Sequence, residues 1–203
     1  MNKIVVIGSS NMDLVVNATK APEGGETVIG TQFDTKFGGK GANQAFSVLR
    51  IGGDVTFVTK VGKDVFGTQI TEHFKDAGMD ISTVFTDDST STGVALITVD
   101  ANAENRIVVV PGANATLTKE DIDKVRMHIE DCEYVIIQLE IPMATVEYAI
   151  NMAWTLGKKV VLNPAPACPL PEGLMSKVFL VTPNETEASL LTGIHVTNEE
   201  ETA

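Results

Sequence analysis

The sequence is poor in cysteine, in positive charge and in long apolar runs, and each shortage excludes a class of protein. Cys132 and Cys168 are too few and too far apart for a disulfide framework or a Cys-x-x-Cys metal site, which favours a reducing compartment. Lys and Arg number 15 against 27 Asp and Glu, and the resulting net charge of −12 argues against binding to nucleic acid or to an anionic membrane surface. The first apolar run, residues 4–7, is too short for a signal peptide or a membrane span. We therefore expect a cytoplasmic protein.

What is present fits a globular protein. With 203 residues, of which 43% are hydrophobic and 21% charged, the chain is long enough to bury one sizeable core. Short apolar runs alternate with amphipathic segments, which is typical of an α/β fold with crossover connections. The expected strands are 4–7, 55–61, 134–139, 160–162 and 178–181; the expected helices are 42–49, 66–76, 118–129 and 142–156, with another opening at 182–187.

Two segments interrupt this alternation. Residues 14–37 contain sparse apolar positions around Pro22 and Gly24, which predicts short strands and a turn outside the main core. Residues 93–110 contain two β-branched runs that flank a polar turn at 100–105, which predicts a hairpin. Thr118 with Asp121 three residues later indicates a capping box at the start of the helix that follows.

The segment 38–45, Gly-Gly-Lys-Gly-Ala-Asn-Gln-Ala, places three glycines, Lys40 and Asn43 where a helix begins. The first turn of a helix has free N–H groups and a partial positive charge, so such a start suits a polar ligand. A Walker loop is excluded because Asp34 stands where its first glycine belongs and Gly41 follows the lysine. A dinucleotide fingerprint is excluded because Gln44 replaces its last glycine.

Polar side chains follow the predicted buried strands at their carboxyl ends, the edge at which open α/β sheets bind ligands: Asn11, Asp13, Glu140, Asn163, Asn184 and Glu187. Taken singly, each has a structural alternative. Asn11 and Asp13 suit a turn, Glu140 suits the dipole of the next helix, and Asn184 with Glu187 suits a capping pair. The three histidines lack metal-ligand spacing, and no Gly-x-Ser-x-Gly elbow occurs.

Five segments together resemble the ribokinases of the PfkB carbohydrate kinase family, and they occur in the order of that family: residues 9–14, 38–45, 139–142, 163–166 and 182–187. The resemblance implies a ribokinase-like three-layer α/β/α sandwich with a small β-sheet lid formed by about 14–37 and 93–110. It implies sugar-binding roles for Asn11, Met12, Asp13, Gly39, Lys40, Gly41, Ala42, Asn43 and Glu140. It also implies that Asn184 lies by the phosphates of ATP and that Glu187 contacts Mg²⁺ through water.

The activity implied by the resemblance is transfer of the γ-phosphoryl group of ATP to O5 of D-ribose, giving D-ribose 5-phosphate. Mg²⁺ would accompany ATP, a monovalent cation such as K⁺ would bind the complete protein, and two lids would pair into a homodimer. Neither nucleic acid nor membrane is an expected partner. A kinase for another sugar such as deoxyribose, or a sugar-binding remnant without activity, is the alternative.

The sequence departs from the family in one respect. The aspartate that serves as base in these kinases belongs to a Gly-Ala-Gly-Asp segment, and no such segment occurs in the 203 residues. Residues 198–203 have the character of a helix start. We therefore expect a C-terminally truncated member of the family, without its catalytic Asp and inactive or nearly so.

Overall fold

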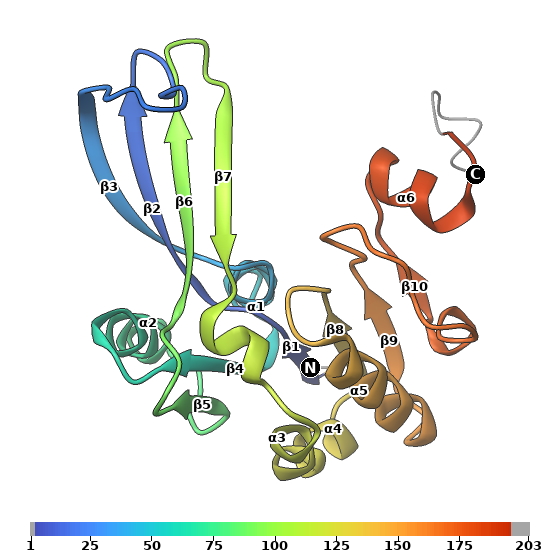
Figure 1. The fold of residues 1–203 in the computed structure, drawn as a ribbon. Helices are drawn as coiled ribbons and strands as arrows, with labels where there is room; N and C mark the ends of the chain where they lie inside the picture. Colours follow the sequence, from blue (N-terminus) through green and yellow to red (C-terminus); the bar gives the residue numbers. More distant parts are fainter. Residues whose placement is uncertain (1–2, 196–203) are drawn as a thin grey trace.

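The computed structural model describes residues 3–195, in which a parallel six-stranded sheet carries helices on both faces (Figure 1). The strand order is β10-β9-β8-β1-β4-β5, and each of these pairings is parallel. The strands are β1 Lys3–Ile7, β2 Asn11–Ala18, β3 Gly30–Gly38, β4 Asp54–Gly62, β5 Val84–Asp87, β6 Gly93–Val99, β7 Asn105–Val110, β8 Tyr134–Ile137, β9 Lys159–Leu162 and β10 Leu180–Val181. The helices are α1 Lys40–Arg50, α2 Val65–Asp76, α3 Lys119–Lys124, α4 Arg126–Asp131, α5 Met143–Thr155 and α6 Glu185–Thr192, with 3-10 turns η1 Gly112–Thr116 and η2 Met175–Lys177.

The central strand β1 explains why the sheet has two buried faces. Val5 and Ile7 pack in the core cluster that includes α3, α4 and α5, whereas Val6 packs in the cluster that includes α1 and α2. Successive side chains of a strand point to opposite faces, so a strand covered on both sides is apolar at every position. The predicted three-layer α/β/α architecture is confirmed.

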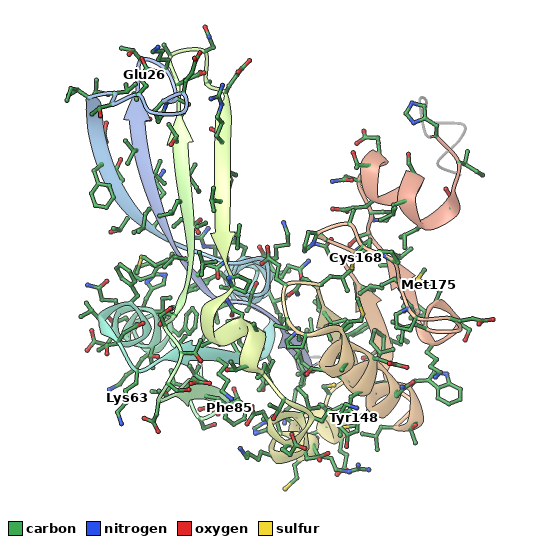
Figure 2. All side chains as sticks on the ribbon, viewed as in Figure 1. Glu26, Lys63, Phe85, Tyr148, Cys168 and Met175 are labelled. Atoms are coloured by element: carbon green, nitrogen blue, oxygen red, sulfur yellow. The ribbon has the colours of Figure 1, made fainter. Side chains whose placement is uncertain are left out.

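A second sheet of four strands, in the order β3-β2-β6-β7, projects away from the helices (Figures 1 and 2). Glu26 marks its far tip in Figure 2. Strand β2 pairs antiparallel with β3 and parallel with β6, and β6 and β7 form the predicted hairpin. The two segments that interrupt the α/β alternation of the sequence thus come together in one sheet.

Several element boundaries differ from the sequence prediction. The region 14–37 contains two long strands rather than short ones, and β2 begins at Asn11, three residues before that region. The helix expected over 118–129 is two helices, because Val125 leaves helical geometry (φ −103°, ψ 10°) and packs into the core. Strand β8 ends at Ile137, two residues early, and β10 contains two residues. The helix start expected at 198–203 lies outside the described residues.

Both cysteines are free: Cys132 is buried and Cys168 partly buried. Within residues 3–195, no helix is both long enough and apolar enough to cross a membrane.

Candidate sugar-binding site

The loop between β1 and β2, residues 8–10, lies directly against the start of α1. The amide of Ala42 donates to the carbonyl of Ser9 at 2.9 Å, and the amide of Gly41 contacts Ser9 Oγ at 3.4 Å. A Cβ on Gly41 would lie 2.6 Å from the Ser9 nitrogen, and a Cβ on Gly39, whose φ is 95°, would lie 2.7 Å from the Ser9 oxygen. These glycines therefore allow close packing of the chain on itself, which brings the start of α1 to the end of β1.

Glu140 connects this helix start to the loop that follows β8. Its Oε2 accepts hydrogen bonds from Ser9 Oγ at 2.5 Å and from the Lys40 amide at 3.0 Å. Its Oε1 lies 3.9 Å from Lys40 Nζ. A carboxylate at a helix N-terminus is stabilised both by the free N–H groups and by the helix dipole. Glu140 Oε2 thus links the loop after β8 to Ser9 and to the start of α1, while Oε1 faces the ammonium group of Lys40.

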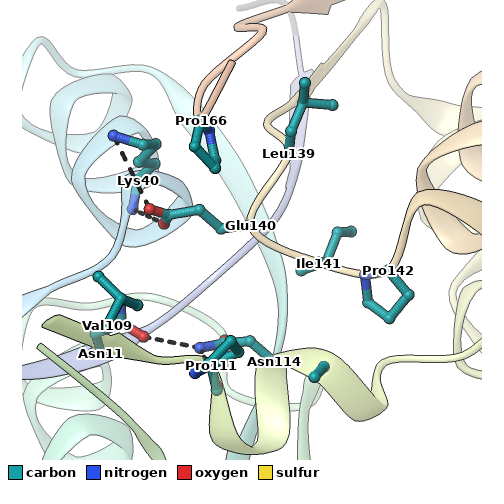
Figure 3. Close-up of a pocket in the computed structure, with 11 residues that line it drawn as sticks. Asn11, Lys40, Val109, Pro111, Asn114, Leu139, Glu140, Ile141, Pro142 and Pro166 are labelled. Atoms are coloured by element: carbon teal, nitrogen blue, oxygen red, sulfur yellow. Dashed lines mark hydrogen bonds and ion pairs between the residues drawn. The ribbon is translucent and has the colours of Figure 1, made fainter. Parts of the chain in front are cut away.

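Asn11, at the start of β2, is held by Asn114 of η1. Asn114 Nδ2 donates to Asn11 Oδ1 at 2.8 Å, and Asn114 Oδ1 accepts from the Ser10 amide at 2.9 Å. Both asparagines are buried. The pair joins the base of the second sheet to the end of the main sheet (Figure 3).

Asp13 follows two residues after Asn11 and so lies on the same face of β2. Burial raises the pKa of the Asp13 carboxyl above its ordinary value, and the nearby Glu140 carboxylate raises it further, while Lys36 acts in the opposite direction. A Cβ on Gly38 would lie 2.3 Å from Asp13 Oδ2, so a glycine there leaves room for the carboxylate. The carboxylates of Asp13 and Glu140 therefore lie near one another in a partly buried environment.

Asn11, Lys40 and Glu140 border a cavity of about 720 Å³ (Figure 3). Its polar lining residues are Asn11, Lys40, Asn114 and Glu140, and its other lining residues are apolar: Val109, Pro111, Ala115, Leu139, Ile141, Pro142 and Pro166. A cavity of this size and mixed lining suits a small molecule with hydroxyl groups on one side.

The remaining predicted sugar-binding residues lie apart from this wall. The side chain of Met12 is buried in the core that contains α1 and α2. Gly41 and Ala42 are buried at the start of α1, Gly39 precedes that helix, and Asn43 is exposed beside Phe46 and His73. Of the predicted set, Asn11, Lys40 and Glu140 line the cavity, and Asp13 lies close to Glu140.

Asn184 and Glu187 form a capping box on α6. The Asn184 amide donates to Glu187 Oε2 at 2.9 Å, and the Glu187 amide donates to Asn184 Oδ1 at 2.8 Å. Both Glu187 carboxylate oxygens accept hydrogen bonds from Asn184, so each oxygen already has a donor within the chain. Such a group suits Mg²⁺ only through the water ligands of the ion, with phosphate oxygens supplying direct contacts. Among residues 3–195, no three His, Cys, Asp or Glu side chains gather as a metal site.

Sequence reasoning missed three residues of this site. Ser9 holds Glu140, Asn114 holds Asn11, and Val109 brings β7 to the cavity wall. Ser9 lies in the segment 9–14, but nothing in its sequence context indicates a bond to Glu140. The segment Pro111-Gly112-Ala113-Asn114 offered one signal for Asn114, a polar residue among small ones directly after a strand.

Comparison with known proteins gives consistent matches over the whole chain. The model of the pfkB family carbohydrate kinases matches residues 1–203. The ribokinase of Staphylococcus aureus is 42% identical over 98% of this chain and 66% of its own length. A deoxyribokinase of Salmonella typhi is 39% identical over 95% of this chain and 63% of its own length. A solved structure of the Arabidopsis thaliana ribokinase with ribose and ATP superposes with a TM-score of 0.91 at 30% identity, covering 98% of this chain and 65% of that one. The chain thus spans about two thirds of the length of these relatives.

Proposed function

This chain belongs to the pfkB family of carbohydrate kinases, and on that premise we propose that it serves the ATP-dependent phosphorylation of D-ribose at O5. The observation that carries the proposal is the polar wall of the cavity. Lys40 supplies a donor, Asn11 supplies an amide and Glu140 supplies an acceptor, with the Asp13 carboxylate close to Glu140. Neighbouring sugar hydroxyls each need a donor and an acceptor, so a wall that offers both within one cavity suits a polyol.

Phosphoryl transfer requires mainly positioning and stabilisation of charge. We assign sugar binding to Asn11, Asp13, Lys40 and Glu140. The other residues proposed to contact the sugar are Met12, Gly39, Gly41, Ala42 and Asn43, whose backbone or side chains lie at the base of β2 and the start of α1. Asn184 is assigned to the phosphates of ATP, and Glu187 to the water shell of Mg²⁺, which would supply charge neutralisation between the phosphate oxygens.

The base is assigned to an aspartate outside these 203 residues. Glu140 is a poor base because its Oε2 already accepts two hydrogen bonds, and Asp13 is assigned to sugar binding. We therefore propose that the 203 residues bind ribose without appreciable turnover. A monovalent cation, a homodimer formed through the second sheet, and a cytoplasmic location belong to the same proposal.

Two measurements on this chain test the proposal. Isothermal calorimetry with D-ribose should give saturable binding in the micromolar range, and a coupled assay should detect no ribose-dependent ADP formation. Robust turnover would refute the assignment of the base, and a folded chain that does not bind ribose would refute the assignment of the site.

A kinase for 2-deoxyribose is a second candidate, which the similarity to the Salmonella typhi deoxyribokinase favours. Parallel titrations of D-ribose and 2-deoxy-D-ribose separate the two. Stronger binding of the deoxy sugar would indicate that no polar group of the cavity uses the 2-hydroxyl. A sugar-binding protein without a kinase role is supported if adding the aspartate-bearing region of a relative restores no turnover.

A further inference from the structure

Asn114 is buried where the chain enters and leaves the second sheet. Its amide contacts the backbone of Ser10, just before β2, and the carbonyl of Pro111, just after β7. A Cβ on Gly93, the first residue of β6, would lie 2.3 Å from Asn114 Nδ2 and 2.4 Å from Asn11 Oδ1. A glycine at 93 thus leaves room for the contact between the two asparagines.

The orientation of the Asn114 amide is fixed by backbone groups. The Ser10 N–H can only donate, so the atom at 2.9 Å from it must be the Asn114 oxygen. The carbonyls of Ser10 and Pro111 can only accept, so the atom at 3.1 and 2.9 Å from them must be the nitrogen. The reversed amide would lose all three bonds.

This orientation dictates that of Asn11. The Asn114 nitrogen lies 2.8 Å from the Asn11 side chain, so the Asn11 atom that meets it must be the oxygen. The Asn11 Nδ2 then points elsewhere. Within residues 3–195 this nitrogen donates to no atom, yet it is not sealed off from solvent. Because Asn11 lines the cavity, the nitrogen is accessible from the cavity.

We infer that Asn114 is a positioning residue that fixes the amide of Asn11 so that its N–H₂ group faces the ligand. The cavity then presents the neutral donor of Asn11 beside the acceptor Glu140, and the ligand atom opposite Asn11 has to be an acceptor, such as a hydroxyl or ring oxygen. Without Asn114, the Asn11 amide could rotate and present either end. For ribose this inference rests on the proposed function.

The first test needs no ligand. Side-chain amide NMR on the isotope-labelled chain should show rapid exchange of the Asn11 N–H₂ protons with water and slow exchange of those of Asn114. Asn11 protons as protected as those of Asn114 would overturn the inference. This result stands whether or not the chain binds ribose, so it separates failure of the inference from failure of the proposed function.

The second test is a double-mutant cycle on D-ribose affinity with Asn11→Ala and Asn114→Ala. Asn114→Ala should weaken binding by about fivefold to tenfold in the wild-type background, the value of one hydrogen bond, and by less than about twofold in the Asn11→Ala background. Equal losses in both backgrounds would show a general structural role and overturn the inference. Asn102→Ala, an exposed asparagine in the turn between β6 and β7, is the matched control. If Asn114→Ala does not fold, the exchange measurement decides alone.

Discussion

At the scale of single residues, Asp13 combines a partly buried carboxylate with a second carboxylate, that of Glu140, nearby. A sugar hydroxyl that donates to this carboxylate forms a charge-assisted bond worth about 1.5–3 kcal/mol. We expect Asp13→Asn to weaken D-ribose binding by about 10- to 150-fold in calorimetry. Asp34→Asn, on β3 of the same sheet, is the matched control and should bind like the wild type. An unchanged affinity in Asp13→Asn would remove Asp13 from the site.

The same carboxylate should destabilise the ligand-free fold. Its native pKa lies above the ordinary value of 3.8, so between the two values the native state binds more protons than the unfolded state. Stability therefore falls as the pH rises through this window, because the carboxyl has to ionise in a partly buried place beside Glu140. We expect Asp13→Asn to raise the melting temperature at pH 7 and to lose this advantage below about pH 4. A variant less stable than the wild type at pH 7 would contradict the burial of the charge.

The predictability of the site differs from residue to residue. Lys40, Glu140 and Asn11 could be found in the sequence because each follows or begins an element whose apolar pattern is clear. Asn114 has only the weak signal of a polar residue after a strand, because its role depends on three backbone groups at positions 10 and 111 that meet only in the folded chain. Met12 is adjacent to the others in sequence, yet the two-residue period of β2 turns its side chain into the core.

At the scale of elements, the contact between the 8–10 loop and α1 sets the geometry of the cavity. Gly→Ala inside a helix normally stabilises by about 1 kcal/mol. At Gly41 the added methyl would meet the backbone of Ser9 and Gly8, so we expect Gly41→Ala to destabilise by about 1–3 kcal/mol in urea unfolding instead.

Gly24→Ala provides the comparison, because nothing lies within 4 Å of its Cβ position and its φ is not positive. It should change stability by less than about 0.5 kcal/mol. If Gly41→Ala were as neutral as Gly24→Ala, the loop and the helix would not be in the close contact described.

The elements themselves were largely predictable, since strands β1, β8 and β9 are mostly apolar and helices α2, α3 and α6 begin at a residue whose side chain caps them. The capping boxes at Thr118 and Asn184 are both present. The lengths of β2 and β3 were not predictable, because these strands are half-exposed and lack a strong alternation. Their extent is set by pairing within the sheet, since β2 pairs with both β3 and β6 along most of its length.

At the scale of the whole molecule, the second sheet has one face toward the cavity and one face away from it. Register places Phe33, Leu96 and Val108 on the face opposite to Asp13, and these side chains are 61%, 47% and 62% exposed. Several exposed apolar side chains on one face of a sheet indicate an interface. A second copy of the chain is the occupant that we propose.

We expect Val108→Lys to shift this chain from dimer to monomer in sedimentation velocity, because a charge would be buried without a partner. Met127→Lys, at a 79% exposed position on α4, is the matched control and should leave the dimer intact. A wild-type chain that sediments as a monomer at all concentrations, or a dimeric Val108→Lys variant, would exclude this surface as the interface.

The central place of β1 has a consequence for synthesis. It pairs on one side with β4 and on the other with β8, whose Tyr134 lies opposite Ile4, 130 positions earlier in the chain. At about 5–20 residues per second, the ribosome needs roughly 6 to 26 s to cover that distance. During this time one edge of a strand that is apolar from Ile4 to Ile7 has no neighbour, which makes the nascent chain a natural client for chaperones that bind extended apolar segments.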